Sequence, residues 1–109
     1  MNTYIKEIKE IVDTINNIEE ELYEKQSELR ALEKEYDFKK SHFLIEQKEE
    51  MKKAGCTNEK MREAYIKIKF EEEINKIHQI KEQVAQKTMQ LKTEYNNLKY
   101  YQELLKIIA

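Results

Sequence analysis

The feature that most constrains this chain is a pair of apolar series that mirror each other about one point in the sequence. In the first half, apolar residues recur at alternating steps of three and four, interrupted only by Lys25 and Lys39, at Tyr4, Ile8, Ile11, Ile15, Ile18, Leu22, Leu29, Leu32, Tyr36 and Phe43. In the second half the same rhythm places them at Phe70, Ile74, Ile77, Val84, Leu91, Tyr95, Leu98 and Leu105. This rhythm is typical of a coiled-coil seam whose two apolar heptad positions face a partner helix.

The two series also predict which helix each one faces. Ile15 and Leu98 lie at equal distances from the junction between residues 56 and 57, and so do Phe43 and Phe70. Two independent helices have no reason to share such a centre, whereas a chain that folds back on itself requires one. We therefore predict an all-α fold, an antiparallel two-helix coiled-coil hairpin that forms a single domain.

The only glycine of the chain lies beside this centre, and the chain has no proline. Gly55 can adopt the left-handed conformation that lets a helix end without a Cβ clash. Met51 and Cys56 have the spacing of the apolar contact that accompanies such a cap, and Thr57 is a candidate N-cap. We expect helix one over about residues 3–54, a turn at 55–57, and helix two over about residues 58–108.

The seam weakens between Phe43 and Phe70. There the apolar residues continue the pattern only after a slip of one residue, at Leu44, Met51, Met61, Tyr65 and Ile68. We expect a local change of supercoil at the tip. Lys39 and Lys40 are expected to face the acidic residues 71–73 across the hairpin.

Where the two termini meet, the chain is more apolar than a two-helix seam requires. The side chains left over are Ile5, Val12, Tyr100, Tyr101, Leu104, Ile107 and Ile108. A helix that is apolar on every face is buried on every face, so we predict that a second hairpin covers this end in a four-helix bundle. The alternative is an exposed, frayed terminus.

Composition gives no support for an enzyme or a metal protein. His42 and His78 are expected to lie several turns apart, and Cys56 has no histidine beside it that could activate a thiol. We also expect a two-helix hairpin to lack a concave site. We therefore predict no catalytic residue, no cofactor and no metal. The chain has one cysteine, and it has no apolar segment long enough for a signal peptide or a membrane-spanning helix. We therefore predict a cytoplasmic protein that does not contact a membrane.

The net charge of −2 is unevenly distributed, because residues 39–69 carry 9 basic and 5 acidic side chains. The tip could therefore contact nucleic acid, through Lys52, Lys53, Lys60, Arg62, Tyr65, Lys67 and Lys69, with the tyrosine stacking on a base. Interleaved glutamates indicate instead an ordinary solvated helix face. Apolar residues off the seam are candidate contacts for a protein partner, namely Tyr23, Phe38, Ile45 and Ile66.

The segment TNEKMREAYIK (residues 57–67) resembles a pattern in small helical proteins of bacteriophages and prophages, which are often encoded near replication and recombination genes. The matching residues are Thr57, Asn58, Arg62, Ala64 and Tyr65. The resemblance implies a non-enzymatic phage early protein. We therefore expect an interaction protein that binds itself and a protein partner, as an adaptor or as an inhibitor of a host system. A nucleic-acid-binding protein that uses the tip is the alternative.

Overall fold

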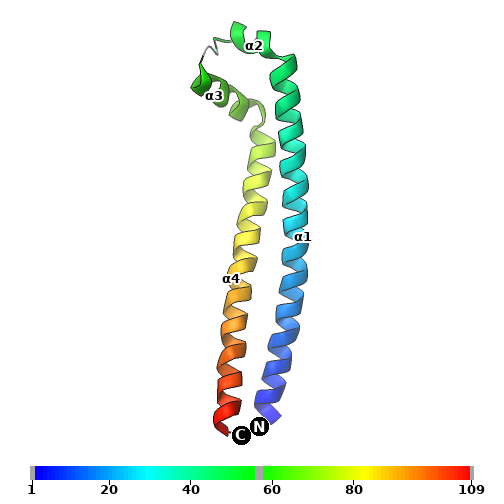
Figure 1. Cartoon of the computed structure of the whole chain (residues 1–109), viewed down its shortest axis with the longest axis vertical. Coiled ribbons are helices and arrows are strands. Elements are labelled where there is room, and N and C mark those ends of the chain that lie inside the picture. The colour runs from blue at the N-terminus through cyan, green and yellow to red at the C-terminus, as the bar shows by residue number, and fades with distance from the viewer. Residues whose placement is uncertain (1, 56–57, 109) are drawn as a thin grey trace. The chain divides into compact units, whose positions relative to one another are not determined.

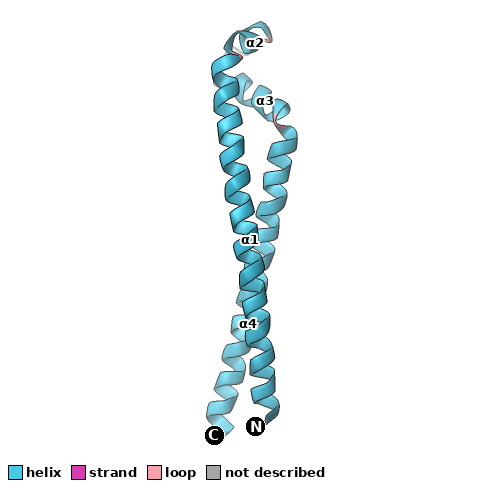
Figure 2. Ribbon diagram, turned by 90° about the vertical axis from the view of Figure 1, so that its right-hand side faces the viewer, coloured by secondary structure: helices cyan, strands magenta, loops and turns pink. Residues whose placement is uncertain are grey.

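The structure is a computed structural model that describes residues 2–55 and 58–108. Its elements are four helices, which are α1 (Asn2–Glu46), α2 (Lys48–Lys53), α3 (Glu59–Lys69) and α4 (Glu71–Ile108) (Figure 1). The described residues contain no strand (Figure 2). The predicted all-α hairpin is confirmed, with α1 and α4 as its two long helices.

The chain packs as two compact units, and each contains parts of α1 and α4, while the second also contains α2 and α3. The first comprises Met1–Ser27 with Glu82–Ala109, and the second comprises Glu28–Lys81. We call the first the base unit and the second the tip unit, and we describe each by itself.

In the base unit, the first half of α1 runs antiparallel to the second half of α4. The Tyr4 and Tyr101 rings lie 6.0 Å apart between centroids, and further along the pair the Tyr95 hydroxyl donates a hydrogen bond to Glu19 Oε1. On α4, Lys87 then forms an ion pair with Glu21 on α1. The seam is closed by three buried isoleucines of α1, Ile11, Ile15 and Ile18. In successive contacts the residue number therefore increases along α1 and decreases along α4, as the mirrored series predicts.

In the tip unit the same antiparallel pairing holds, around an aromatic core. Phe43 and Phe70 pack edge to face with centroids 5.6 Å apart, and Tyr36 packs against Phe70 at 5.8 Å. Edge-to-face rings stabilise beyond their buried area, by about 0.5–1.5 kcal/mol per pair. Lys39 Nζ lies 3.8 Å from a Glu73 carboxylate oxygen, which confirms for Lys39 the predicted charge pairing across the hairpin.

The two continuous helices that the sequence predicts are each kinked near the tip. α1 ends at Glu46, and Gln47 (φ −110°, ψ 22°) separates it from α2. Phe70 (φ −110°, ψ 27°) separates α3 from α4 in the same way. Backbone hydrogen bonds cross both positions, from Gln47 N to Phe43 O at 2.8 Å and from Phe70 N to Ile66 O at 2.9 Å. Both breaks are therefore kinks in a continuous helical backbone, and neither is a loop.

The kinks change which residues enter the core. Phe43 and Phe70 form a buried cluster with Met51 of α2 and Ile66 of α3, and Met51 is only 3% exposed. Leu44 and Tyr65 pack against it, as the slipped seam predicts. The expectation for Met61 and Ile68 is wrong, because both are exposed. Ile66 takes the inward position on α3 instead.

The reversal at Gly55 has the predicted backbone conformation. Gly55 has φ +82°, and its N–H donates to Lys52 O at 3.1 Å. The N-cap of α3 is Asn58, whose Oδ1 accepts a hydrogen bond from Met61 N at 2.9 Å. Asn58 thus fills the role that the sequence assigned to Thr57. Thr57 and the proposed contact of Met51 with Cys56 lie outside the described residues.

Candidate functional site

The first candidate surface is the apolar end of the base unit, where the start of α1 lies beside the end of α4 (Figures 1 and 2). We call it the base surface and define it by the seven side chains predicted to bind a second copy, Ile5, Val12, Tyr100, Tyr101, Leu104, Ile107 and Ile108. Five of them are exposed, with Ile107 at 80% and Tyr100 at 61%. Tyr101 and Leu104 are half-buried.

The base surface is left over because the seam is complete without it. Leu98 and Leu105 of α4 are half-buried in the pairing with α1. Tyr101 is held between two rings, that of Tyr4 at 6.0 Å and that of Tyr100 at 5.4 Å. The structure thus brings together at one end the residues that the sequence singled out in both helices.

The basic side chains of the tip lie on α2 and α3. Lys52 and Lys53 occupy the last turn of α2, while Lys60, Arg62, Lys67 and Lys69 lie along α3 and are exposed. Lys52 Nζ lies 4.0 Å from a Glu49 carboxylate oxygen.

Tyr65 does not share this exposure. Its ring stacks on Phe43 with centroids 6.0 Å apart and planes at 17°, and its hydroxyl donates to Glu50 Oε1 at 2.9 Å. A ring that stacks on a nucleobase needs a face open to solvent. The contact with Phe43 covers one face of Tyr65, which weakens the case for a nucleic-acid site here.

The off-seam apolar residues fall into two groups. Tyr23, Phe38 and Ile45 are exposed, as predicted for contacts with a partner. The prediction for Ile66 is wrong, because this side chain is buried in the tip core. The kink at Phe70 turns α3 so that Ile66 faces Phe43 and Ile68 faces outward.

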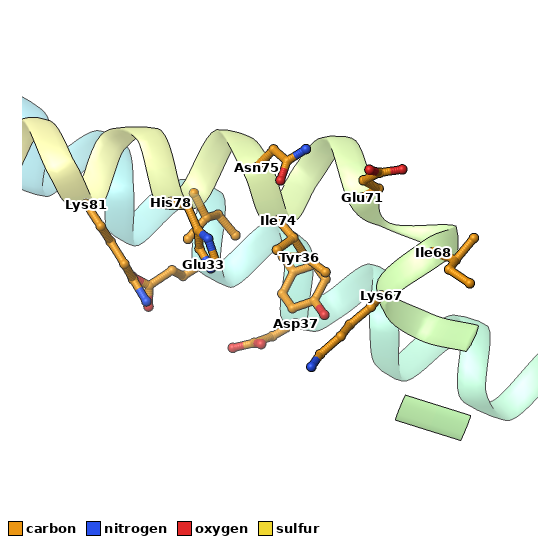
Figure 3. Close-up of a pocket in the computed structure, with 11 residues that line it drawn as sticks. Glu33, Tyr36, Asp37, Lys67, Ile68, Glu71, Ile74, Asn75, His78 and Lys81 are labelled. Carbon is orange, nitrogen blue, oxygen red and sulfur yellow. The ribbon is translucent and has the colours of Figure 1, made fainter. Parts of the chain in front are cut away.

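The sequence analysis missed a groove in the tip unit, formed by α1, α3 and α4 (Figure 3). Its volume is about 800 Å³, within the range of ligand sites in proteins, so the expectation that this hairpin offers no concave surface is wrong. The residues that line it are Glu33, Tyr36, Asp37, Lys67, Ile68, Glu71, Ile74, Asn75, Ile77, His78 and Lys81. We call it the tip groove.

The floor of the tip groove is apolar and its rim is charged. Ile77 is buried, Tyr36 and Ile74 are half-buried, and Ile68 stands at the edge with 76% of its surface exposed. Burial, followed by the charges of Asp37 and Glu73, raises the pKa of the Tyr36 phenol. Tyr36 therefore stays neutral well above physiological pH and acts in the groove as an apolar ring with a hydrogen-bonding tip.

The kink at Phe70 sets the part that α3 plays in the tip groove. The slipped pattern predicts that Ile68 lies on the seam. With the kink, Lys67 and Ile68 line the groove together with residues of α1 and α4 (Figure 3). The failure of the mirrored series between Phe43 and Phe70 was the signal of this change, although it did not show its direction.

The histidines lie apart in the tip unit. His42 stacks on Phe38 with centroids 5.9 Å apart, and its Nε2 lies 3.0 Å from Glu46 Oε1. His78 lines the tip groove. Within residues 2–55 and 58–108, no three histidine or carboxylate side chains are placed to share a metal ion. Cys56 lies outside these residues.

In comparisons with known proteins, no family model, no curated protein and no solved structure matches the chain. None of the helices formed by the described residues combines the length and the apolar character needed to cross a membrane.

Proposed function

We propose that this chain is a non-enzymatic coiled-coil interaction protein that pairs with a second copy through the base surface and binds a protein partner. The observation that supports it is the exposure of Ile107 and Tyr100, together with Ile5, Val12 and Ile108, at one end of the base unit. Large apolar side chains that gather exposed at one end of a protein mark interaction sites. A second hairpin would cover it in a four-helix bundle.

Dimerisation would bury apolar side chains that are exposed to solvent in the single chain. Burying a large apolar side chain stabilises by about 1.5–3 kcal/mol. Ile107 occurs once in each copy, so its loss would weaken a symmetric dimer by about 3–6 kcal/mol. Since 1.4 kcal/mol is a factor of ten, the Kd would rise by at least about 100-fold.

Light scattering coupled to gel filtration tests the pairing. The wild-type chain is expected to elute with twice its 13.3 kDa mass at micromolar concentration, and Tyr100→Ser/Ile107→Ser is expected to elute as a monomer. Ile45→Ser is the matched control, because Ile45 is 79% exposed but lies on the tip unit. A wild-type monomer, or equal effects of both variants, would rule out the base surface as the interface.

The resemblance of residues 57–67 to phage helical proteins extends the proposal to a role as an adaptor or as an inhibitor of a host system in the host cytoplasm. Nucleic-acid binding through the tip has less support, because Tyr65 is engaged with Phe43 and Glu50. A gel-shift titration at two salt concentrations separates these functions. Binding that weakens steeply with salt and is lost in Lys52→Glu/Lys53→Glu would favour nucleic acid.

A further inference from the structure

We infer that the tip groove is the docking site for the protein partner, and that it binds an amphipathic α-helix of about three turns. The inference rests on the proposed role as an interaction protein, but it concerns a different surface from the base surface. Three observations carry it, namely the dimensions of the groove, its apolar floor and edge, and the distribution of charge on its rim.

The dimensions fit a helix. The groove extends along α4 from Glu71 to Lys81, which is ten residues or about 15 Å. α1 and α4 supply its two sides, and Lys67 and Ile68 from the end of α3 complete its lining (Figure 3). A third helix laid on a helix pair buries its apolar stripe in such a groove.

The apolar floor and edge supply the anchoring contacts. Tyr36 and Ile74 offer apolar surface along the floor above the buried Ile77, and the exposed side chain of Ile68 adds an apolar edge. Helices that bind in grooves present large apolar residues at i, i+3 or i+4, and i+7.

The rim carries both signs of charge. Glu33, Asp37 and Glu71 are acidic, while Lys67 and Lys81 are basic. Among the described residues, none of these five forms an ion pair within 4.0 Å. A partner helix with acidic and basic flanks would complement this rim, whereas a polyanion would meet three carboxylates.

Two fluorescent 14-residue helical peptides serve as probes, and both carry leucines at i, i+4 and i+7. The mixed peptide has one flank of glutamate and one of lysine, and the basic peptide has lysine on both flanks. Fluorescence anisotropy measures their binding to Tyr100→Ser/Ile107→Ser, in which the base surface is disrupted. The wild-type groove is expected to prefer the mixed peptide, and Lys67→Glu/Lys81→Glu is expected to reverse the preference, whichever way the helix lies.

Ile68→Ser is expected to lower the affinity for the mixed peptide at least tenfold, while the matched Ile45→Ser leaves that affinity unchanged. Both isoleucines are exposed on the tip unit, so neither substitution threatens the fold. Equal affinities for Ile68→Ser and Ile45→Ser, no reversal by the lysine changes, or no binding up to roughly 1 mM peptide would overturn the inference. Dimerisation of the Tyr100→Ser/Ile107→Ser chain in light scattering that Ile68→Ser abolishes would assign the groove to a second copy and overturn it too. Because the base surface is disrupted throughout, these outcomes are independent of whether the wild-type chain dimerises.

Discussion

Replacing Gly55 by alanine should destabilise the hairpin through the backbone alone. Gly55 has φ +82°, and a Cβ built there would meet no atom within 4 Å. The space is open, so the whole cost comes from placing an L-residue in the left-handed region, about 1–2 kcal/mol. For a chain of 109 residues this corresponds to a fall in Tm of about 4–9 °C.

A mirror-image residue gives the control. D-alanine favours positive φ and restricts the unfolded chain, so it should stabilise by about 0.4–1 kcal/mol relative to glycine. The protein can be assembled from a segment 1–55 that ends in the D-residue and a segment 56–109 that begins with Cys56, joined by thioester ligation.

Urea denaturation followed by far-ultraviolet circular dichroism measures the three proteins at one concentration, because self-association changes apparent stability. The expected order of stability is D-alanine, then glycine, then L-alanine. Equal stabilities of the L- and D-alanine proteins would show that residue 55 has no positive φ, and the account of the chain reversal would then be wrong.

Three further predictions concern single side chains. Phe70→Ala should cost about 3–5 kcal/mol of unfolding free energy in urea titrations, because Phe70 is buried in the tip core, whereas Phe38→Ala at an exposed site should stay within about 0.5 kcal/mol; similar losses would contradict the core assignment. Asn58→Ala should cost about 0.5–2 kcal/mol and raise amide hydrogen exchange at the start of α3, and unchanged exchange would refute the cap. The hydrogen bond from Tyr95 to Glu19 raises the pKa of Tyr95. The contribution of this bond to folding stability is therefore complete below pH about 10, and it is lost as the pH rises through the pKa of Tyr95 in the folded protein. Tyr95→Phe should therefore lose less stability than wild type between pH about 9 and pH about 11, and identical pH profiles would argue against the bond.

Much of the fold could be predicted from sequence because the hairpin is a consequence of periodicity. The mirrored seam required antiparallel pairing, and the pair Phe43 and Phe70 is in contact as it demanded. The conformation of Gly55 followed from its being the only glycine of the chain, beside the centre of the mirrored series. The surplus of apolar residues at the termini likewise predicted the exposed base surface, since two stripes suffice for two helices.

The kinks and the tip groove could not be predicted in this way. Gln47 and Phe70 are neither glycine nor proline, so no local signal marks them as helix breaks. Their backbone is set by tertiary packing, because the kinks allow Met51 and Ile66 to reach the two phenylalanines. Ile66 and Ile68 are both isoleucines on α3, and only the direction of α3 decides which one is buried.

The central claim, that two hairpins meet through their base surfaces, is tested most directly by a distance between two copies. A spin label at Glu103→Cys, in a chain with Cys56→Ser, would be measured by double electron–electron resonance. Since helices in a bundle pack about 8–10 Å apart, the labels of a base-to-base dimer should lie within about 40 Å of each other. We predict a distance peak in that range that disappears in Tyr100→Ser/Ile107→Ser. No such peak in the wild-type protein, or a peak that the double substitution leaves unchanged, would contradict the account.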